Sequence, residues 1–250
     1  QHVSAFIDIP LYFEGAQDGG KITKLFDLDT KACGAVLMYD EGNSRIVGRI
    51  TSFNSNSDSG PLNFIYTPDE PDVVKFYDLT GYKVLYLGDY GDGSGLMAML
   101  KEESTGKYLY QNMEMDSWID FNIMNCTQEV FAGSDVISDN TVYFRIRNSS
   151  YLFMGEGNRL YFYDVNTKRV KLFTSYTTGN IVEILQDADA GGIGVALDDG
   201  NFYIYKLSTE VLADDNPGEK GLLFSVSGLG KIVDVEWKWG GSYNWAFGRY

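Results

Sequence analysis

The fold is decided by residues 181–226, which read IVEILQDADAGGIGVALDDGNFYIYKLSTEVLADDNPGEKGLLFSV. Apolar runs alternate in this stretch with short turns rich in glycine, aspartate and asparagine. That pattern is typical of antiparallel strands joined by tight hairpins. We predict four strands, over residues 181–185, 192–197, 201–207 and 222–226, with an acidic loop over 213–220 before the last one.

Two of these strands are apolar on both faces. Within residues 192–197 the large side chains share one face and the small ones share the other. Within residues 201–207 aromatic and aliphatic side chains occupy both faces. A sheet that is apolar on both sides must be covered on both sides, as a sheet stacked between two neighbours is.

The same hairpin recurs along the chain, with turns near residues 42, 105, 157, 200 and 241. A unit of about 40–50 residues with several short strands is the period of a propeller blade. We therefore predict an all-β, β-propeller-like fold with about five recognisable blades. The further predicted strands cover residues 34–39, 45–53, 84–90, 96–100, 107–113, 141–147, 151–154, 160–165, 170–175, 232–239 and 243–248.

A large β-sandwich is the alternative, because it also uses alternating strands and glycine turns. The two folds differ in chain order: a propeller forms separate sheets from consecutive hairpins. A helical period is nearly absent, and residues 118–130 give the weakest pattern. We treat residues 1–250 as one domain. Because the chain opens with Gln1 and shows no leader pattern, we expect either that an upstream segment was removed or that this is the C-terminal part of a longer protein.

The composition sets limits on partners. The formal net charge is −15, which repels phosphate backbones, so we expect no nucleic-acid partner. No apolar run is long enough for a membrane-spanning helix. The two cysteines, Cys33 and Cys126, lack the CxxC spacing of zinc and redox motifs, and whether they pair is left open.

Sequence motifs for catalysis are missing. His2 is the only histidine, so histidine-based triads and histidine-rich metal sites are excluded. Paired carboxylates remain as a route to glycoside hydrolysis, with Asp89, Asp92, Asp187, Asp189 and Glu236 as candidates beside glycines or strand ends. The alternative is that these carboxylates are ordinary turn residues of an acidic protein.

No cofactor is expected, apart from a Ca²⁺ ion. The loop of residues 88–95 has closely spaced oxygen ligands that suit Ca²⁺, although it lacks the order of an EF-hand. The metal ligands therefore stay unassigned.

A ligand site is predicted around Trp118, whose polar surroundings make burial in the core unnecessary. Asp89, Asp92 and Asn56 lie in other long loops, and loops at one end of a propeller gather around its axis. A flat ring flanked by carboxylates and amides suits a sugar or a peptide. The aromatic residues near the C-terminus, such as Trp237, instead fit packing between blades.

The run of residues 84–113, the unit of residues 181–207 and the acidic Gly/Asn turns resemble the C-terminal propeller-like region of PKD-like family surface lipoproteins of Bacteroidetes. Such proteins are often encoded near SusC/SusD-type nutrient importers. The resemblance implies a cell-surface, outer-membrane location through an upstream lipid anchor that this chain does not contain; a periplasmic or secreted location is the alternative. It transfers no catalytic residue.

Three functions follow from these observations. The first is a non-catalytic cell-surface binding or accessory module, which captures a glycan or peptide beside a SusC/SusD-type outer-membrane importer. The second is a carbohydrate-active enzyme that uses paired carboxylates. The third is a structural subunit of an importer complex. The sequence favours the first, because repeated hairpins are present and catalytic signatures are not.

Overall fold

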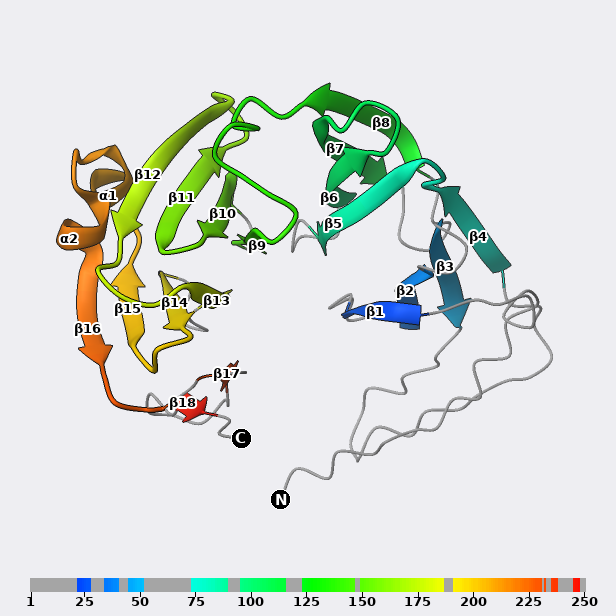
Figure 1. Ribbon diagram of the computed structural model, residues 1–250. Helices are drawn as coiled ribbons and strands as arrows, with labels where there is room; N and C mark the ends of the chain where they lie inside the picture. Colours follow the sequence, from blue (N-terminus) through cyan, green and yellow to red (C-terminus); the bar gives the residue numbers. More distant parts are fainter. Residues whose placement is uncertain are drawn as a thin grey trace, which may run out of the picture. The chain divides into compact units, whose positions relative to one another are not determined.

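The computed structural model describes residues 22–27, 34–40, 45–51, 73–89, 95–115, 123–146, 149–186, 191–230, 232, 235–237 and 245–247. Almost every element is a β-strand (Figure 1). The strands up to residue 130 are β1 (Ile22–Asp27), β2 (Gly34–Asp40), β3 (Arg45–Thr51), β4 (Val73–Asp78), β5 (Tyr82–Asp89), β6 (Gly95–Glu102), β7 (Tyr108–Met115) and β8 (Ile123–Val130). The later strands are β9 (Val142–Arg145), β10 (Tyr151–Glu156), β11 (Arg159–Asp164), β12 (Arg169–Ser175), β13 (Ile181–Gln186), β14 (Gly192–Leu197), β15 (Phe202–Lys206), β16 (Leu222–Val226), β17 (Val235–Trp237) and β18 (Trp245–Phe247).

Each sheet is built from strands that are consecutive in the chain. The strands β1–β4, β5–β8, β9–β12 and β13–β16 form four-stranded sheets in chain order, and β17 pairs with β18. Within the described residues, no strand from a distant hairpin enters another sheet. The fold is therefore propeller-like, and the β-sandwich alternative is wrong. The described residues form five successive sheets, in agreement with the prediction of about five blades.

The predicted strands match the structure best in the unit that decides the fold. Residues 192–197 and 222–226 coincide with β14 and β16. The sequence did not predict β1 or β4. Strand β8 covers much of residues 118–130, where the sequence pattern was weakest. All three are outer strands of their sheets, where one flank has no neighbouring strand and charged or polar residues are common.

The chain divides into two compact units, and the β1–β4 sheet belongs to the first. The second unit comprises Lys83–Met115 and Ile123–Tyr250 and contains the other sheets. The side-chain packing described below lies within this second unit.

The β9–β12 sheet is packed on both faces. One face meets the β5–β8 sheet in an apolar cluster that includes Met97, Leu152 and Tyr163. The other face meets the β13–β16 sheet in a larger cluster, where the rings of Phe173 and Tyr205 lie edge to face with centroids 5.1 Å apart. A core on both faces is what stacked blades require.

Strand β14 confirms the prediction of two buried faces, because all six of its residues are buried. Ile193 and Val195 belong to the cluster shared with the β9–β12 sheet. Ala196 belongs to a separate cluster with Phe202 and Ile232. The small residues on this second face leave room for the ring of Phe202, which packs closely against Gly194.

Main-chain hydrogen bonds link the successive turns of these sheets. The amide of Ile181 donates to the carbonyl of Gly157 at 2.8 Å. The amide of Asp198 donates to the carbonyl of Asn180 at 2.9 Å, and the amide of Leu229 donates to the carbonyl of Gly200 at 3.2 Å. Buried main-chain groups need such partners, so the turns hold one another as well as the strands they connect.

Two short helices, α1 (Thr209–Ala213) and α2 (Pro217–Gly221), lie between β15 and β16. The prediction of an acidic loop over residues 213–220 is therefore wrong for α2. Helices of five residues are too short to show a helical period, and only their capping residues mark them. Ser208 caps α1 by accepting from the amide of Val211, and Pro217 occupies the first turn of α2. Neither described helix is long enough to cross a membrane.

Candidate functional site

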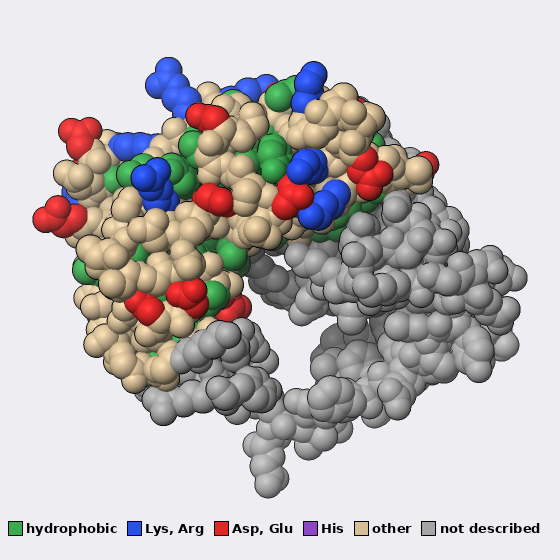
Figure 2. All heavy atoms as spheres, in the orientation of Figure 1, with side chains coloured by type: hydrophobic (Ala, Val, Ile, Leu, Met, Phe, Trp, Pro, Cys, Tyr) green, Lys and Arg blue, Asp and Glu red, His purple; other side chains and the backbone are tan. Residues whose placement is uncertain are grey.

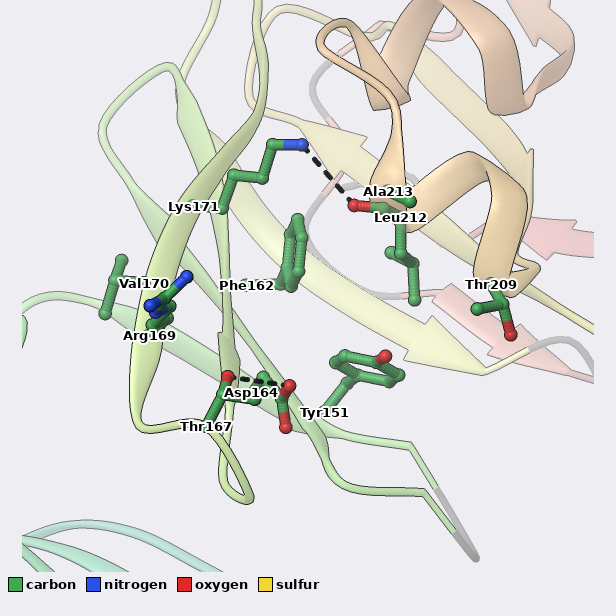
Figure 3. Close-up of a pocket in the computed structure, with 10 residues that line it drawn as sticks. All are labelled: Tyr151, Phe162, Asp164, Thr167, Arg169, Val170, Lys171, Thr209, Leu212 and Ala213. Carbon is green, nitrogen blue, oxygen red and sulfur yellow. Dashed lines mark hydrogen bonds between the residues drawn. The ribbon is translucent and has the colours of Figure 1, made fainter.

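A pocket of about 340 Å³ lies between the β9–β12 sheet and helix α1. Its floor comes from the sheet and one of its walls from α1 (Figure 3). The lining residues are Tyr151, Phe162, Asp164, Thr167, Arg169, Val170, Lys171, Thr209, Leu212 and Ala213. This volume lies within the range of sites for small ligands.

The strand register places the floor residues in a row across the sheet. Tyr151 on β10 stands opposite Asp164 on β11, and Asp164 stands opposite Arg169 on β12. In the next row, Phe162 stands opposite Lys171. Alternation along each strand brings these residues to the face that meets the β13–β16 sheet. The two rows therefore combine aromatic and charged side chains on one surface.

The apolar part of the pocket is formed by Phe162, Tyr151 and Leu212. Phe162 is 5% exposed, and its ring meets the partly buried ring of Tyr151 edge to face with centroids 5.8 Å apart. Figure 3 shows Phe162 in the middle of the pocket, with Leu212 and Thr209 of α1 across from it. An apolar group that enters the pocket would contact both rings.

Helix α1 is fixed to the sheet by Lys171. Its ammonium group donates to the main-chain carbonyls of Leu212, at 3.5 Å, and of Asp214. Both carbonyls lie at the C-terminal end of α1, where a cation interacts favourably with the helix dipole. Lys171 thus holds the wall of the pocket in place.

The carboxylate of Asp164 is occupied by the turn between β11 and β12. Thr167 Oγ1 donates to Asp164 Oδ2 at 2.8 Å, and the amide of Asn166 donates to Oδ1 at 3.0 Å. Such aspartate-centred turns satisfy the carboxylate locally. Arg169, which stands opposite, is exposed, and its side chain makes no hydrogen bond or ion pair with any residue that the structure describes.

On the surface shown in Figure 2, basic and acidic side chains lie interspersed over the described part of the chain. In the pocket itself the charged groups are Arg169, Lys171 and Asp164. The carboxylate and one cation are engaged by the protein, which leaves one guanidinium facing solvent. The arrangement can bind an apolar group together with an anion.

A second polar cluster surrounds Asp139, in the connection from β8 to β9. Lys83 and Lys101 form ion pairs with its carboxylate at 3.0 and 2.9 Å, and the Tyr108 hydroxyl donates to it at 2.9 Å. These hydrogen bonds, those from Lys101 and Lys83 most strongly, hold the pKa of Asp139 far below its usual range. The lysines and the tyrosine come from three strands of the β5–β8 sheet.

The same connection is also held by the neighbouring sheet, because Ser138 Oγ donates to the carboxylate of Glu156 at 3.0 Å and Thr141 Oγ1 donates to the same oxygen. Asp139 and Glu156 therefore anchor the β8–β9 connection to the β5–β8 sheet and to the β9–β12 sheet, respectively. Their oxygens are used by protein donors, so this cluster is structural.

Three of the ligand residues predicted from sequence, Trp118, Asp92 and Asn56, lie outside the described residues. Asp89 ends β5, and its side chain is not described. The predicted carboxylates Asp187 and Asp189 also lie outside the described part. These predictions remain predictions.

Among the other candidates, Glu236 and Trp237 lie on β17, where only the backbone is described. Cys126 is exposed on β8, and Cys33 lies outside the described residues. Within the described part, no cluster of three or more His, Cys, Asp or Glu residues could hold a metal ion. Most of the Ca²⁺ loop at 88–95 falls outside that part.

The pocket could not be predicted from the sequence. Its floor depends on which residues face each other across three strands, and its wall depends on a helix too short to recognise. The available signals were Ser208 as a helix cap and the pair Arg169 and Lys171 at alternate positions of β12.

No family model and no curated protein matches the sequence. The structure is similar to that of Raptor from Chaetomium thermophilum, with a TM-score of 0.52 and 11% identity over 92% of this chain. It also matches Hsv2 from Kluyvelomyces marxianus, with a TM-score of 0.44 and 11% identity over 86% of this chain. The matched parts are 19% of the Raptor chain and 53% of the Hsv2 chain. The similarity to Raptor supports the propeller-like fold.

Proposed function

We propose that this chain is a non-catalytic binding or scaffold module and that the pocket between the β9–β12 sheet and α1 receives its ligand. The observation that carries the proposal is the pocket itself: an aromatic floor beside Arg169, a cation that no described residue neutralises. Apolar surface with a few polar groups is the usual composition of a ligand site.

The resemblance to surface lipoproteins extends this proposal. The module would capture a peptide or glycan at the cell surface, beside a SusC/SusD-type importer, with its lipid anchor upstream of Gln1. Between these two ligands the pocket favours a peptide, because the buried ring of Phe162 and the side chain of Leu212 offer apolar contacts suited to a side chain. Binding at this site would need no cofactor.

The test is a binding screen of short peptides and oligosaccharides by ligand-observed NMR with the purified chain. Thr209→Trp places a large ring at the exposed rim of the pocket, and Thr177→Trp makes the same exchange at an exposed turn elsewhere. We expect bound compounds to lose affinity for the Thr209→Trp variant and to keep it for Thr177→Trp. Equal binding by both variants, or cleavage of any oligosaccharide, would contradict the proposal.

A further inference from the structure

Arg169 stands out among the charged groups of the pocket. The residue directly opposite it, Asp164, is the expected ion-pair partner, yet the carboxylate of Asp164 bonds to Thr167 and to the amide of Asn166. No ion pair or hydrogen bond joins the guanidinium of Arg169 to any described residue. Its planar guanidinium is therefore available to a ligand, and it matches a carboxylate with two parallel hydrogen bonds.

Lys171 cannot take the same role without releasing α1. Its ammonium group already donates to two carbonyls at the end of that helix. Among the described residues that line the pocket, one cation, the guanidinium of Arg169, is therefore free. A single negative charge fits this arrangement better than a phosphate dianion, because Asp164 lies in the same row and the chain carries a net charge of −15.

The group attached to that charge must be apolar. Phe162 and Leu212 are 5% and 8% exposed, and the ring of Tyr151 meets Phe162 edge to face. A volume of about 340 Å³ accommodates a group the size of an aromatic side chain. The cation and the apolar surface lie in adjacent rows of one sheet, so one small group can contact both.

We infer that the pocket binds an apolar group that carries one carboxylate, with the carboxylate on Arg169 and the apolar group against Phe162, Tyr151 and Leu212. This inference rests on the proposed function and specifies its ligand. The same chemistry is presented by the C-terminal residue of a peptide and by a free aromatic acid.

The experiment uses the purified chain and three probes: N-acetylphenylalanine, N-acetylphenylalanine amide and the tripeptide acetyl-Ala-Ala-Phe with a free carboxylate. Binding is followed by the amide signals of Val170 and Leu212 in ¹H–¹⁵N spectra. We expect the acid to bind about tenfold more tightly than the amide, the ratio for a charge-assisted hydrogen bond. Tighter binding of the tripeptide than of the single residue identifies a peptide end as the source, and equal binding identifies a free acid.

The matched variants are Arg169→Gln and Arg159→Gln. Both remove one positive charge from an exposed strand residue, but Arg159 lies at the other end of β11, away from the pocket. We expect the preference for the acid to disappear in Arg169→Gln and to persist in Arg159→Gln.

Three results would overturn the inference. Equal affinity for the acid and the amide would show that the pocket binds the apolar group but does not recognise the carboxylate. If the Arg169→Gln variant still prefers the acid over the amide, a group other than Arg169 binds the carboxylate. If no probe shifts the signals of Val170 and Leu212, the ligand chemistry is wrong, whereas the broader binding function still depends on the Thr209→Trp screen.

Discussion

Asp164 and Arg169 face each other across the β11–β12 ladder, and they have separate tasks. The carboxylate holds the turn that joins the two strands, through Thr167 and the amide of Asn166. The guanidinium is left for solvent or a ligand. Opposite charges at paired positions suggest an ion pair between Asp164 and Arg169. Because only Asp164 is bonded within the turn, substitutions of the two residues should change the free energy of unfolding by different amounts.

We expect Asp164→Ala to lower the free energy of unfolding by about 1–2 kcal/mol, because two hydrogen bonds to a carboxylate are lost. Arg169→Gln should change it by less than about 0.5 kcal/mol, as is usual for an exposed side chain with no partner. Urea unfolding of both variants checks this. A loss on Arg169→Gln equal to that on Asp164→Ala would show that the two side chains do form an ion pair.

The sequence was sufficient to predict the blades because the hairpin pattern is local. The turn at residues 198–201 and the apolar faces of β14 depend on residues close in the chain, and the structure confirms both. Outer strands such as β1 and β4 were missed because their pattern is not constrained by two neighbours. The short helices were missed because five residues contain little more than one turn.

The site was harder to predict because it depends on pairing. Nothing in the sequence states that Tyr151, Asp164 and Arg169 form one row, since this requires the register of three strands. Nor does it state that α1 lies over that row. Charge alone could not distinguish Arg169 from Lys171, because their difference lies in the carbonyls that only the folded chain brings to Lys171.

The Asp139 cluster predicts a dependence of stability on pH. Since its pKa is lower in the folded chain than in the unfolded one, its contribution is present above the unfolded value of about 3.9 and is lost as pH falls through the folded value. We expect Asp139→Asn to melt at a lower temperature than the parent chain at pH 7. The difference should shrink as the pH is lowered below about 4.

Asp135→Asn is the matched control, because Asp135 is an exposed residue of the same connection. Its melting temperature should follow that of the parent chain at both pH values. A difference between Asp139→Asn and the parent chain that stays constant from pH 7 to about pH 2 would show that the charge of Asp139 is not what stabilises the connection.

Gly200 is expected to tolerate no side chain. Its φ is +86°, and a Cβ atom there would lie 2.3 Å from the carbonyl oxygen of Gly230. Gly106 has a φ of +70° and no atom near its Cβ position. Gly106→Ala should therefore lower the free energy of unfolding only by the cost of a positive φ for alanine, about 1–2 kcal/mol. Gly200→Ala should cost at least about 1 kcal/mol more, since the main chain must move. Equal losses in thermal unfolding would mean that the two turns do not depend on this close approach.

Tyr176 and Tyr205 form a buried pair of hydroxyl groups. The Tyr205 hydroxyl donates to that of Tyr176 at 3.1 Å, and the side chains are 3% and 6% exposed for Tyr205 and Tyr176. Each single change to Phe leaves one buried hydroxyl without this partner and should lower the free energy of unfolding by about 1–2 kcal/mol. The double change should cost less than the sum of the two, because neither hydroxyl is then left behind.

The same pair predicts a loss of stability in alkali. Burial raises the pKa of Tyr205 to about 12 and that of Tyr176 well above its usual range. A raised pKa means that the neutral form stabilises the fold below the unfolded value of about 10 and that this contribution is lost as pH rises through the folded value. Between pH 10 and 12 the parent chain should therefore lose more stability than the double Phe variant does. Equal losses in urea unfolding over that range would assign the alkaline sensitivity to other groups.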